Sequence, residues 1–139
     1  MPAIPIVSPL RKKISLYSDI RKDLDINPIT KDLAVKRDEE AVKESIKTLI
    51  LTDRGERLFQ PRLGGDIRKT LFENNTPATL KVLQEAIKDT INNHEPRANL
   101  IDVEVSSTYD DNKVVVNIVF YVRNLETPVN LTVFLERIR

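Results

Sequence analysis

The sequence contains no cysteine, only one histidine and no long apolar stretch. The absence of cysteine excludes disulfides and thiolate metal or redox centres. His94 alone cannot form a metal site without further nitrogen or sulfur ligands. Prolines interrupt the first ten residues, where a signal peptide needs an unbroken apolar run. We therefore expect a soluble, non-exported protein with no cofactor, no metal and no membrane span.

A strong net charge is also missing. Lysine and arginine number 22 against 21 acidic residues, which gives a net charge of +1, and both signs are scattered along the chain. Such a balance gives no field that would favour nucleic acid or an anionic membrane. The three tyrosines stand singly, without the interleaved basic and aromatic residues of a base-stacking surface. We expect neither nucleic acid nor membrane as a partner.

No catalytic motif stands out. A serine nucleophile would need His94 as its base and a strand-turn-helix elbow, which the sequence does not contain. Paired carboxylates for glycoside cleavage are always available in a chain with 21 acids, and helix caps or solvated faces explain most of them. The residues considered for such a pair are Glu39, Glu40, Glu56, Asp66 and Glu73. We predict that the protein is not an enzyme, with a cell-wall glycosidase as the rival hypothesis.

The first 37 residues contain four of the eight prolines and little sustained periodicity. This composition predicts an extended N-terminal arm, with at most short helical turns over residues 15–24. Such an arm would lie on its own domain or on a neighbour. Residues 38–139 then form the single folded domain.

Residues 38–55 have the pattern of one amphipathic helix. Acidic residues fill the first turn from Asp38, and Gly55 marks the end, so both helix ends are expected to be capped. Pro61, Gly64 and Gly65 then predict a loop, which lacks the rest of a phosphate-binding motif. The apolar positions of the helix are Val42, Ile46, Leu49 and Ile50.

Two more helices follow the loop. Asp66 is a candidate cap for a short helix that carries Ile67, Leu71 and Phe72. Residues 76–77 place a threonine cap before a proline at the first helical position. This second main helix should continue to about residue 93, because Pro96 disfavours helical geometry at the residue before it. Its apolar stripe comprises Leu80, Leu83, Ala86, Ile87 and Ile91.

From residue 99 the period changes from 3.6 to 2, which predicts three strands joined as a meander. In the first strand, Ile101, Val103 and Val105 alternate with acidic residues. Residues 110–112 supply a hairpin turn. The strand from residue 113 is apolar on both faces and should be central. The last strand, residues 129–137, should form an edge and directs Val129, Leu131, Val133 and Leu135 to one face.

The predicted fold is therefore α+β: an N-terminal arm, two main helices with a short one between them, then a three-stranded antiparallel sheet.

Several segments, taken in order, resemble one known family. The stretch "TDRGERLFQPRLGGDI", residues 52–67, resembles the Thr-x-x-Gly-x-Arg and Pro-x-x-Gly loop of the baseplate wedge family of contractile tails. That family includes phage sheath initiators and the TssE subunit of type VI secretion. "YSDI" at residues 17–20, "LFENNTP" at 71–77 and "EPR" at 95–97 resemble further family blocks. The family often has an aromatic residue where this chain has His94.

The resemblance implies a non-enzymatic structural subunit of a phage tail baseplate, made in the host cytoplasm and located in the virion. In the family, the Glu-Pro-Arg segment docks on a helical bundle of neighbouring wedge subunits. The C-terminal sheet is similar to a sheath-subunit domain on which the first sheath ring assembles. A type VI secretion baseplate subunit is the third reading, and it differs in host context.

The residues give a physical basis both to docking through the Glu-Pro-Arg segment and to sheath assembly on the last strand. Each of these two features also has a simpler structural explanation. Pro96 fixes the backbone and would hold Glu95 and Arg97 on a rigid corner, ready to meet a partner. A helix stop with a surface ion pair is the alternative. The last strand would offer an open edge for the tail sheath protein by β-augmentation. Charges at Glu136, Arg137 and Arg139, or the N-terminal arm, could instead protect that edge.

Overall fold

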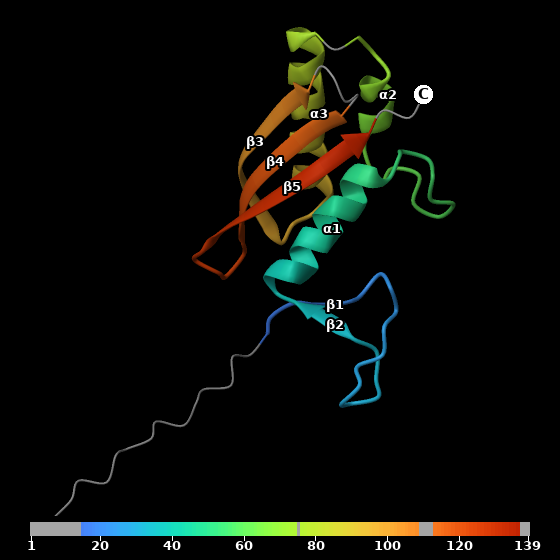
Figure 1. Ribbon diagram of the computed structural model, residues 1–139, viewed down its shortest axis with the longest axis vertical. Helices are drawn as coiled ribbons and strands as arrows, with labels where there is room; N and C mark the ends of the chain where they lie inside the picture. The colour runs from blue at the N-terminus through green and yellow to red at the C-terminus, as the bar shows by residue number, and fades with distance from the viewer. Residues whose placement is uncertain (1–14, 75, 109–112, 137–139) are drawn as a thin grey trace, which may run out of the picture.

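The computed structural model describes residues 15–74, 76–108 and 113–136 (Figure 1). A small N-terminal hairpin is followed by helices that pack on one face of an antiparallel sheet, so the predicted α+β class is confirmed. None of the described helices has the length and apolar content needed to cross a membrane. The elements are β1 (Ser18–Ile20), β2 (Val35–Arg37), α1 (Glu39–Leu51), α2 (Ile67–Leu71), α3 (Pro77–His94), β3 (Ala98–Thr108), β4 (Lys113–Val122) and β5 (Pro128–Glu136).

The N-terminal region differs from the expected arm. Instead of short helical turns, β1 and β2 pair as an antiparallel hairpin, with Asp19 opposite Lys36. The hairpin extends below α1 in Figure 1 and contacts it through β2. This pairing could not be predicted from the strand propensity of the local sequence, because each strand has only three residues. Contacts with α1 and with the corner between α3 and β3 fix the two strands instead. Residues 1–14 of the predicted arm lie outside the described residues.

Helix α1 confirms the amphipathic pattern, but its first cap works differently from the prediction. Asp38 stands at the N-cap with a φ of 47°, and its side chain makes no capping hydrogen bond. Its carboxylate accepts hydrogen bonds from the backbone N–H groups of Leu16, at 2.8 Å, and Tyr17, at 3.3 Å. Asp38 therefore ties the hairpin to the start of the helix. At the other end α1 stops at Leu51, ahead of Gly55.

The two later helices follow the predicted order. Asp66 precedes α2 but makes no side-chain cap, because its carboxylate pairs with Lys69 at 2.9 Å. The Thr76 cap of α3 is confirmed: its hydroxyl accepts a hydrogen bond from the N–H of Thr79 at 3.2 Å. Helix α3 ends at His94, one residue beyond the expected end. The Thr-Pro start of α3 could be predicted from the sequence, because the cap and the proline affect only the first turn of the helix.

The sheet has the predicted order, with β4 between β3 and β5. The register shifts between Leu100 and Asp102, so Ile101 is the extra residue of a β-bulge and is exposed. Strict alternation had placed Ile101 on the core face, and this was wrong. Because of the bulge, Leu100 and Val103 both face the core. The turn predicted at residues 110–112 lies outside the described residues.

The core lies between the helices and one face of the sheet. Alternate residues of β4 are buried against α1 and α3, as the period-2 pattern predicts. The other face of β4 is less buried: Val115 and Val119 are half-buried and Tyr121 is exposed. The largest fully buried side chains are Phe120, Ile46, Ile67, Leu83, Ile87, Ile91, Ile118, Val42, Val103, Val116 and Val122.

The loop between α1 and α2 is closed by two adjacent glycines. Gly64 has a φ of +96°, and a Cβ placed there would lie 2.3 Å from the carbonyl oxygen of Thr52. The N–H of Gly65 donates to that same carbonyl at 3.3 Å. The close approach is what brings the end of the loop back to the end of α1. Gly55, with a φ of +89°, has no atom within 4 Å of such a Cβ.

We expect Gly64→Ala to destabilise the protein more than Gly55→Ala. Both changes place alanine at positive φ, which costs about 1 kcal/mol or more. Only Gly64→Ala adds a clash with backbone, and we expect it to lower the free energy of unfolding by at least about 1 kcal/mol beyond the matched variant. Urea denaturation followed by circular dichroism measures the difference. Equal losses in the two variants would show that the Thr52 contact does not constrain the loop.

Candidate functional site

The corner between α3 and β3 is built by residues 95–97. Pro96 cannot continue the helix, and Glu95 before it takes a non-helical conformation with φ −123° and ψ 80°. The N–H of Glu95 still bonds to the carbonyl of Ile91 at 2.9 Å, which closes the last helical turn. The carbonyl of Arg97 accepts the N–H of Arg123 at 2.7 Å, beyond the end of β4. The tripeptide is therefore a fixed corner.

The Glu95 side chain points into the protein and is only 2% exposed. One of its oxygens accepts hydrogen bonds from the Ser45 hydroxyl on α1 and from Nη2 of Arg97, the latter at 3.0 Å. The other accepts from Nε of Arg97 at 2.7 Å. The carboxylate thus receives the two-pronged guanidinium contact and a hydroxyl from another helix. Glu95 joins α1 to the corner.

Arg97 extends the network to the N-terminal hairpin. Its Nη1 donates to the carboxylate of Asp19 on β1, with a shortest distance of 3.1 Å. Its guanidinium carbon also lies 5.8 Å from the ring centre of Tyr17, within the range of a cation–π contact. One arginine side chain therefore bridges the nearby carboxylate of Glu95 and that of Asp19, 78 residues earlier in the sequence.

The network sets the charge of both its main partners. Burial alone would raise the pKa of Glu95, but hydrogen bonds from Arg97 and Ser45, with the Arg97 charge, lower it below its usual value. The hydrogen bond to Glu95 raises the pKa of Arg97 above its usual value. Both groups are thus held in their charged forms, as a buried ion pair requires.

These contacts correct the expected role of Glu95. Its carboxylate is buried and already bonded, so it does not lie on the surface ready to meet a partner's basic residue. Pro96 is exposed, and the Arg97 side chain is 25% exposed. Asp19 belongs to the "YSDI" segment at residues 17–20, but its contact with Arg97, 78 residues away, was not predicted, and neither was the contact of Ser45 with Glu95, 50 residues away.

The predicted residues of the last strand also face inward. Val129, Val133 and Leu135 are buried in the core, and Leu131 is partly buried against it. Their side chains hold β5 on the domain. What remains for a partner is the outer main-chain edge of the strand and its outward side chains.

The edge of β5 is open in the part of the chain that the structure describes. No described strand pairs with that edge, because β1 and β2 form a separate two-stranded sheet. Residues 15–37 therefore do not pair as a strand with that edge. Glu136 pairs with Lys113 of the neighbouring strand at 3.6 Å, while Arg137 and Arg139 lie outside the described residues.

The described carboxylates whose pKa departs from its usual value all have a lowered pKa. A glycosidase acid needs a raised pKa, whereas hydrogen bonds from Lys36 and Lys69 lower the pKa of Glu44 and Asp66. Among the candidates, Glu39 accepts a hydrogen bond from Thr127, and Glu56 accepts one from the N–H of Asp53. Within residues 15–74, 76–108 and 113–136, no cluster of acidic and histidine side chains could hold a metal ion.

Residues 36–126 match the protein family described as baseplate wedge protein gp25. The baseplate wedge protein gp25 of Enterobacteria phage T4 is 36% identical over 107 residues, covering 77% of this chain and 80% of the phage protein.

Solved structures have the same fold. A subunit of the anti-feeding prophage baseplate has a TM-score of 0.68 at 28% identity, covering 79% of this chain and 88% of its own. A Geobacter sulfurreducens protein with the provisional name tail lysozyme has a TM-score of 0.68 at 28% identity, covering 73% of this chain and 92% of its own. A chain of the type VI secretion baseplate shares the fold at 17% identity, with a TM-score of 0.52 and coverages of 69% and 92%.

The Glu95 network predicts a defined pH dependence of stability. Because the pKa of Glu95 is lowered on folding, its contribution is complete above the unfolded value, near 4.5, and is lost as pH falls through the lower folded value. We expect Glu95→Gln to lower the free energy of unfolding by about 3 kcal/mol at pH 7 and by much less at pH 3. Urea denaturation of both proteins across this pH range measures the gap.

Glu104→Gln is the matched control, because Glu104 is exposed on β3. Its effect should be small at every pH. A Glu95→Gln effect that stays constant down to pH 3 would contradict the assignment of the charged carboxylate to this network.

Proposed function

Because the chain belongs to the baseplate wedge protein gp25 family, we propose that it is a structural subunit that docks on neighbouring wedge subunits and initiates assembly of the tail sheath. The observation that carries this proposal is the family match over residues 36–126, which includes the corner at residues 95–97 and strands β3 and β4. The working location is the tail baseplate of the virion, after synthesis in the host cytoplasm. Residues 38–139 form the wedge domain, with residues 1–37 as its N-terminal arm.

The first proposed contact is made by the corner at residues 95–97. Pro96 is the exposed tip, and the Glu95–Arg97 network behind it fixes the backbone, so little conformational entropy is lost when a partner binds. The exposed part of Arg97 can donate to a helix C-terminus or a carboxylate of the wedge helical bundle. Glu95 acts from inside by positioning Arg97.

The second proposed contact is the outer edge of β5. This strand has nine residues paired with β4 without interruption, so its unpaired backbone groups form a regular ladder. A strand of the tail sheath protein could add to that ladder by main-chain hydrogen bonds. Buried Val129, Val133 and Leu135 would keep the edge in place as the partner binds.

The rival is a cell-wall glycosidase, and the name of the Geobacter sulfurreducens relative favours it. The lowered pKa values of Glu44, Asp66 and Glu95 argue against a general acid at those positions. Turnover of peptidoglycan by the purified protein would overturn the structural assignment. A type VI secretion subunit would share the same contacts in a different assembly.

We expect Pro96→Lys to weaken binding to the neighbouring wedge subunits at least tenfold. A long charged side chain at the tip would prevent close contact, while the internal network stays intact. The measurement is co-purification with those subunits, followed by titration of the complex. Asn92→Lys, at an exposed position of the last turn of α3, is the control and should bind normally. Normal binding by a folded Pro96→Lys protein would remove the corner from the interface.

We expect Asn130→Lys/Phe134→Lys to block sheath addition, because lysines on an exposed edge strand disfavour pairing with another strand. Both side chains are exposed on β5. The matched control is Glu104→Lys/Ser106→Lys on the opposite edge strand, β3. Electron microscopy of assembled tails would count baseplates that carry sheath. Equal counts for the two double variants would rule against the β5 edge as the sheath contact.

A further inference from the structure

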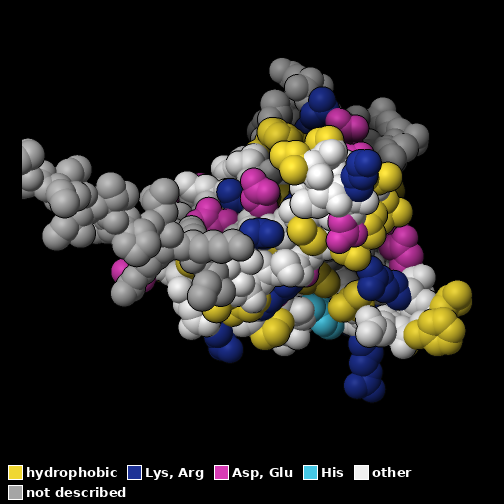
Figure 2. All heavy atoms as spheres, turned by 90° about the horizontal axis from the view of Figure 1, so that it is seen from below, with side chains coloured by type: hydrophobic (Ala, Val, Ile, Leu, Met, Phe, Trp, Pro, Cys, Tyr) yellow, Lys and Arg dark blue, Asp and Glu magenta, His cyan; other side chains and the backbone are white. Residues whose placement is uncertain are grey.

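The loop between α1 and α2 ends in an apolar tip. Leu58 is 93% exposed and Phe59 is 97% exposed, the two highest values among the exposed large apolar side chains of the described residues. In Figure 2 an apolar projection stands out from the side where this loop extends in Figure 1. A leucine and a phenylalanine side by side in water are costly unless a partner covers them.

The tip is held in place by contacts at its base. The N–H of Gly55 bonds to the carbonyl of Pro61 at 2.9 Å and thereby closes a ring around the tip. Asp53 pairs with Arg68 at the start of α2, at 3.3 Å. With Gly64 packed on Thr52, the loop has a defined shape, so binding through the tip would cost little ordering entropy.

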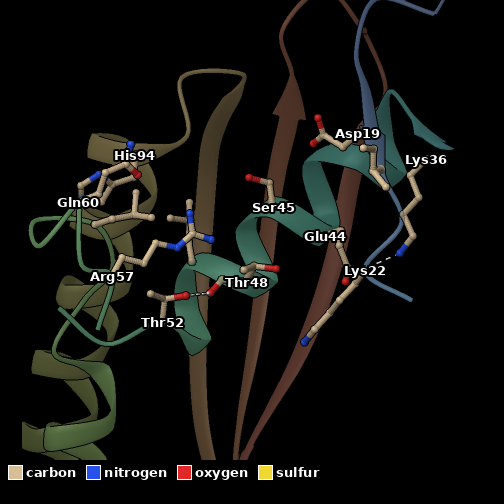
Figure 3. A pocket seen from close by; sticks show the side chains of 13 residues that line it. Asp19, Lys22, Lys36, Glu44, Ser45, Thr48, Thr52, Arg57, Gln60 and His94 are labelled. Atoms are coloured by element: carbon tan, nitrogen blue, oxygen red, sulfur yellow. Dashed lines mark hydrogen bonds and ion pairs between the residues drawn. The ribbon is translucent and has the colours of Figure 1, made fainter. Parts of the chain in front are cut away.

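A groove of about 340 Å³ adjoins this loop. Its walls are the outer face of α1, the hairpin, the loop and the last residue of α3. In Figure 3 Arg57 extends from the loop toward the face of α1 that carries Ser45 and Thr48, and Lys22 lies at the far end beside Glu44. His94 connects the groove to the corner at residues 95–97.

Three cations and two acids line the groove. Its two acids are already engaged: Glu44 pairs with Lys36 at 3.0 Å and Asp19 with Arg97 at 3.1 Å. Arg57 and Arg62 form no ion pair with a carboxylate of the described residues, and Lys22 acts on Glu44 through its charge without forming an ion pair.

We propose that the tip and the groove form a second docking surface, which binds an acidic amphipathic segment of another subunit of the same tail. Leu58 and Phe59 would enter an apolar pocket of that subunit, and its carboxylates would meet Arg57 and Lys22. An aromatic anchor with an adjacent arginine is the usual composition of a binding hot spot. This inference rests on the proposed function for the class of partner, but it concerns a surface that adjoins the corner without including its exposed tip, Pro96, or any residue of β5.

The charge of the loop favours a protein partner over a membrane. Residues 53–66 contain three basic and three acidic residues, so the loop as a whole is neutral. Membrane recognition by electrostatics needs a cluster of about four or more basic residues. Individual cations beside apolar side chains instead match a surface on which carboxylates surround an apolar pocket.

The test uses fluorescent overlapping peptides that cover the other baseplate subunits of the same tail, titrated with the whole chain. We expect the binding peptides to combine leucine or an aromatic residue with several acids. Leu58→Ala/Phe59→Ala should weaken their binding at least tenfold. Arg57→Glu should weaken it similarly and reduce its salt dependence. Circular dichroism and urea denaturation should show both variants folded, because all three side chains are exposed.

The chain supplies matched controls. Leu24→Ala/Ile29→Ala removes another exposed apolar pair, on the hairpin, and Lys81→Glu reverses an exposed charge on α3. Both should bind peptides as the wild type does. Equal loss in tip and control variants would overturn the proposal, and so would peptide binding that is indifferent to the tip.

Two further outcomes are distinguishable. Wild-type protein that co-purifies with the wedge subunits but binds no acidic peptide would refute the second surface and leave the proposed function standing. Failure to bind any baseplate subunit would count against the proposed function itself. Binding of the tip to vesicles of phosphatidylserine and phosphatidylcholine, with no peptide bound, would replace the protein partner by a membrane.

Discussion

The buried carboxylate of Glu95 is the contact on which the arrangement of the elements depends. It accepts hydrogen bonds from α1 and from Arg97, and Arg97 in turn binds the hairpin through Asp19. A charge in that position is tolerable only because each oxygen has a donor. One corner therefore fixes three segments that the chain forms separately: the hairpin, the first helix and the entrance to the sheet.

This internal role changes how the Glu-Pro-Arg tripeptide should be understood. A short charged motif at a helix end suggests a surface to which a partner protein binds. In this chain two of its side chains first complete the fold, and only Pro96 with part of Arg97 is left outside. Folding and the proposed docking therefore involve the same residues, and a variant that removes the glutamate would not separate the two. Experiments on the corner must change its exposed tip.

Features with local causes could be predicted from the sequence. Pro96 ended α3, the threonine cap began it, and apolar residues on both faces identified β4 as the central strand. Features that depend on distant contacts could not be predicted. Asp38 was expected to cap a helix, but residues 16–17 pass close enough to take its carboxylate. Ser45 and Asp19 carry no local signal of their part in the corner.

The bulge at Ile101 has a consequence for the sheet as a template. On β3 the extra residue breaks the repeat of outward-facing backbone groups, whereas β5 keeps its repeat over its full length. A strand added at the β5 edge would meet regularly spaced backbone groups, whereas a strand added at the β3 edge would meet the irregular spacing at the bulge. The two edges of the sheet are therefore unequal as sites for the addition of a strand. Of these two edges, that of β5 alone keeps its repeat, so an added strand would be favoured on that side of the sheet.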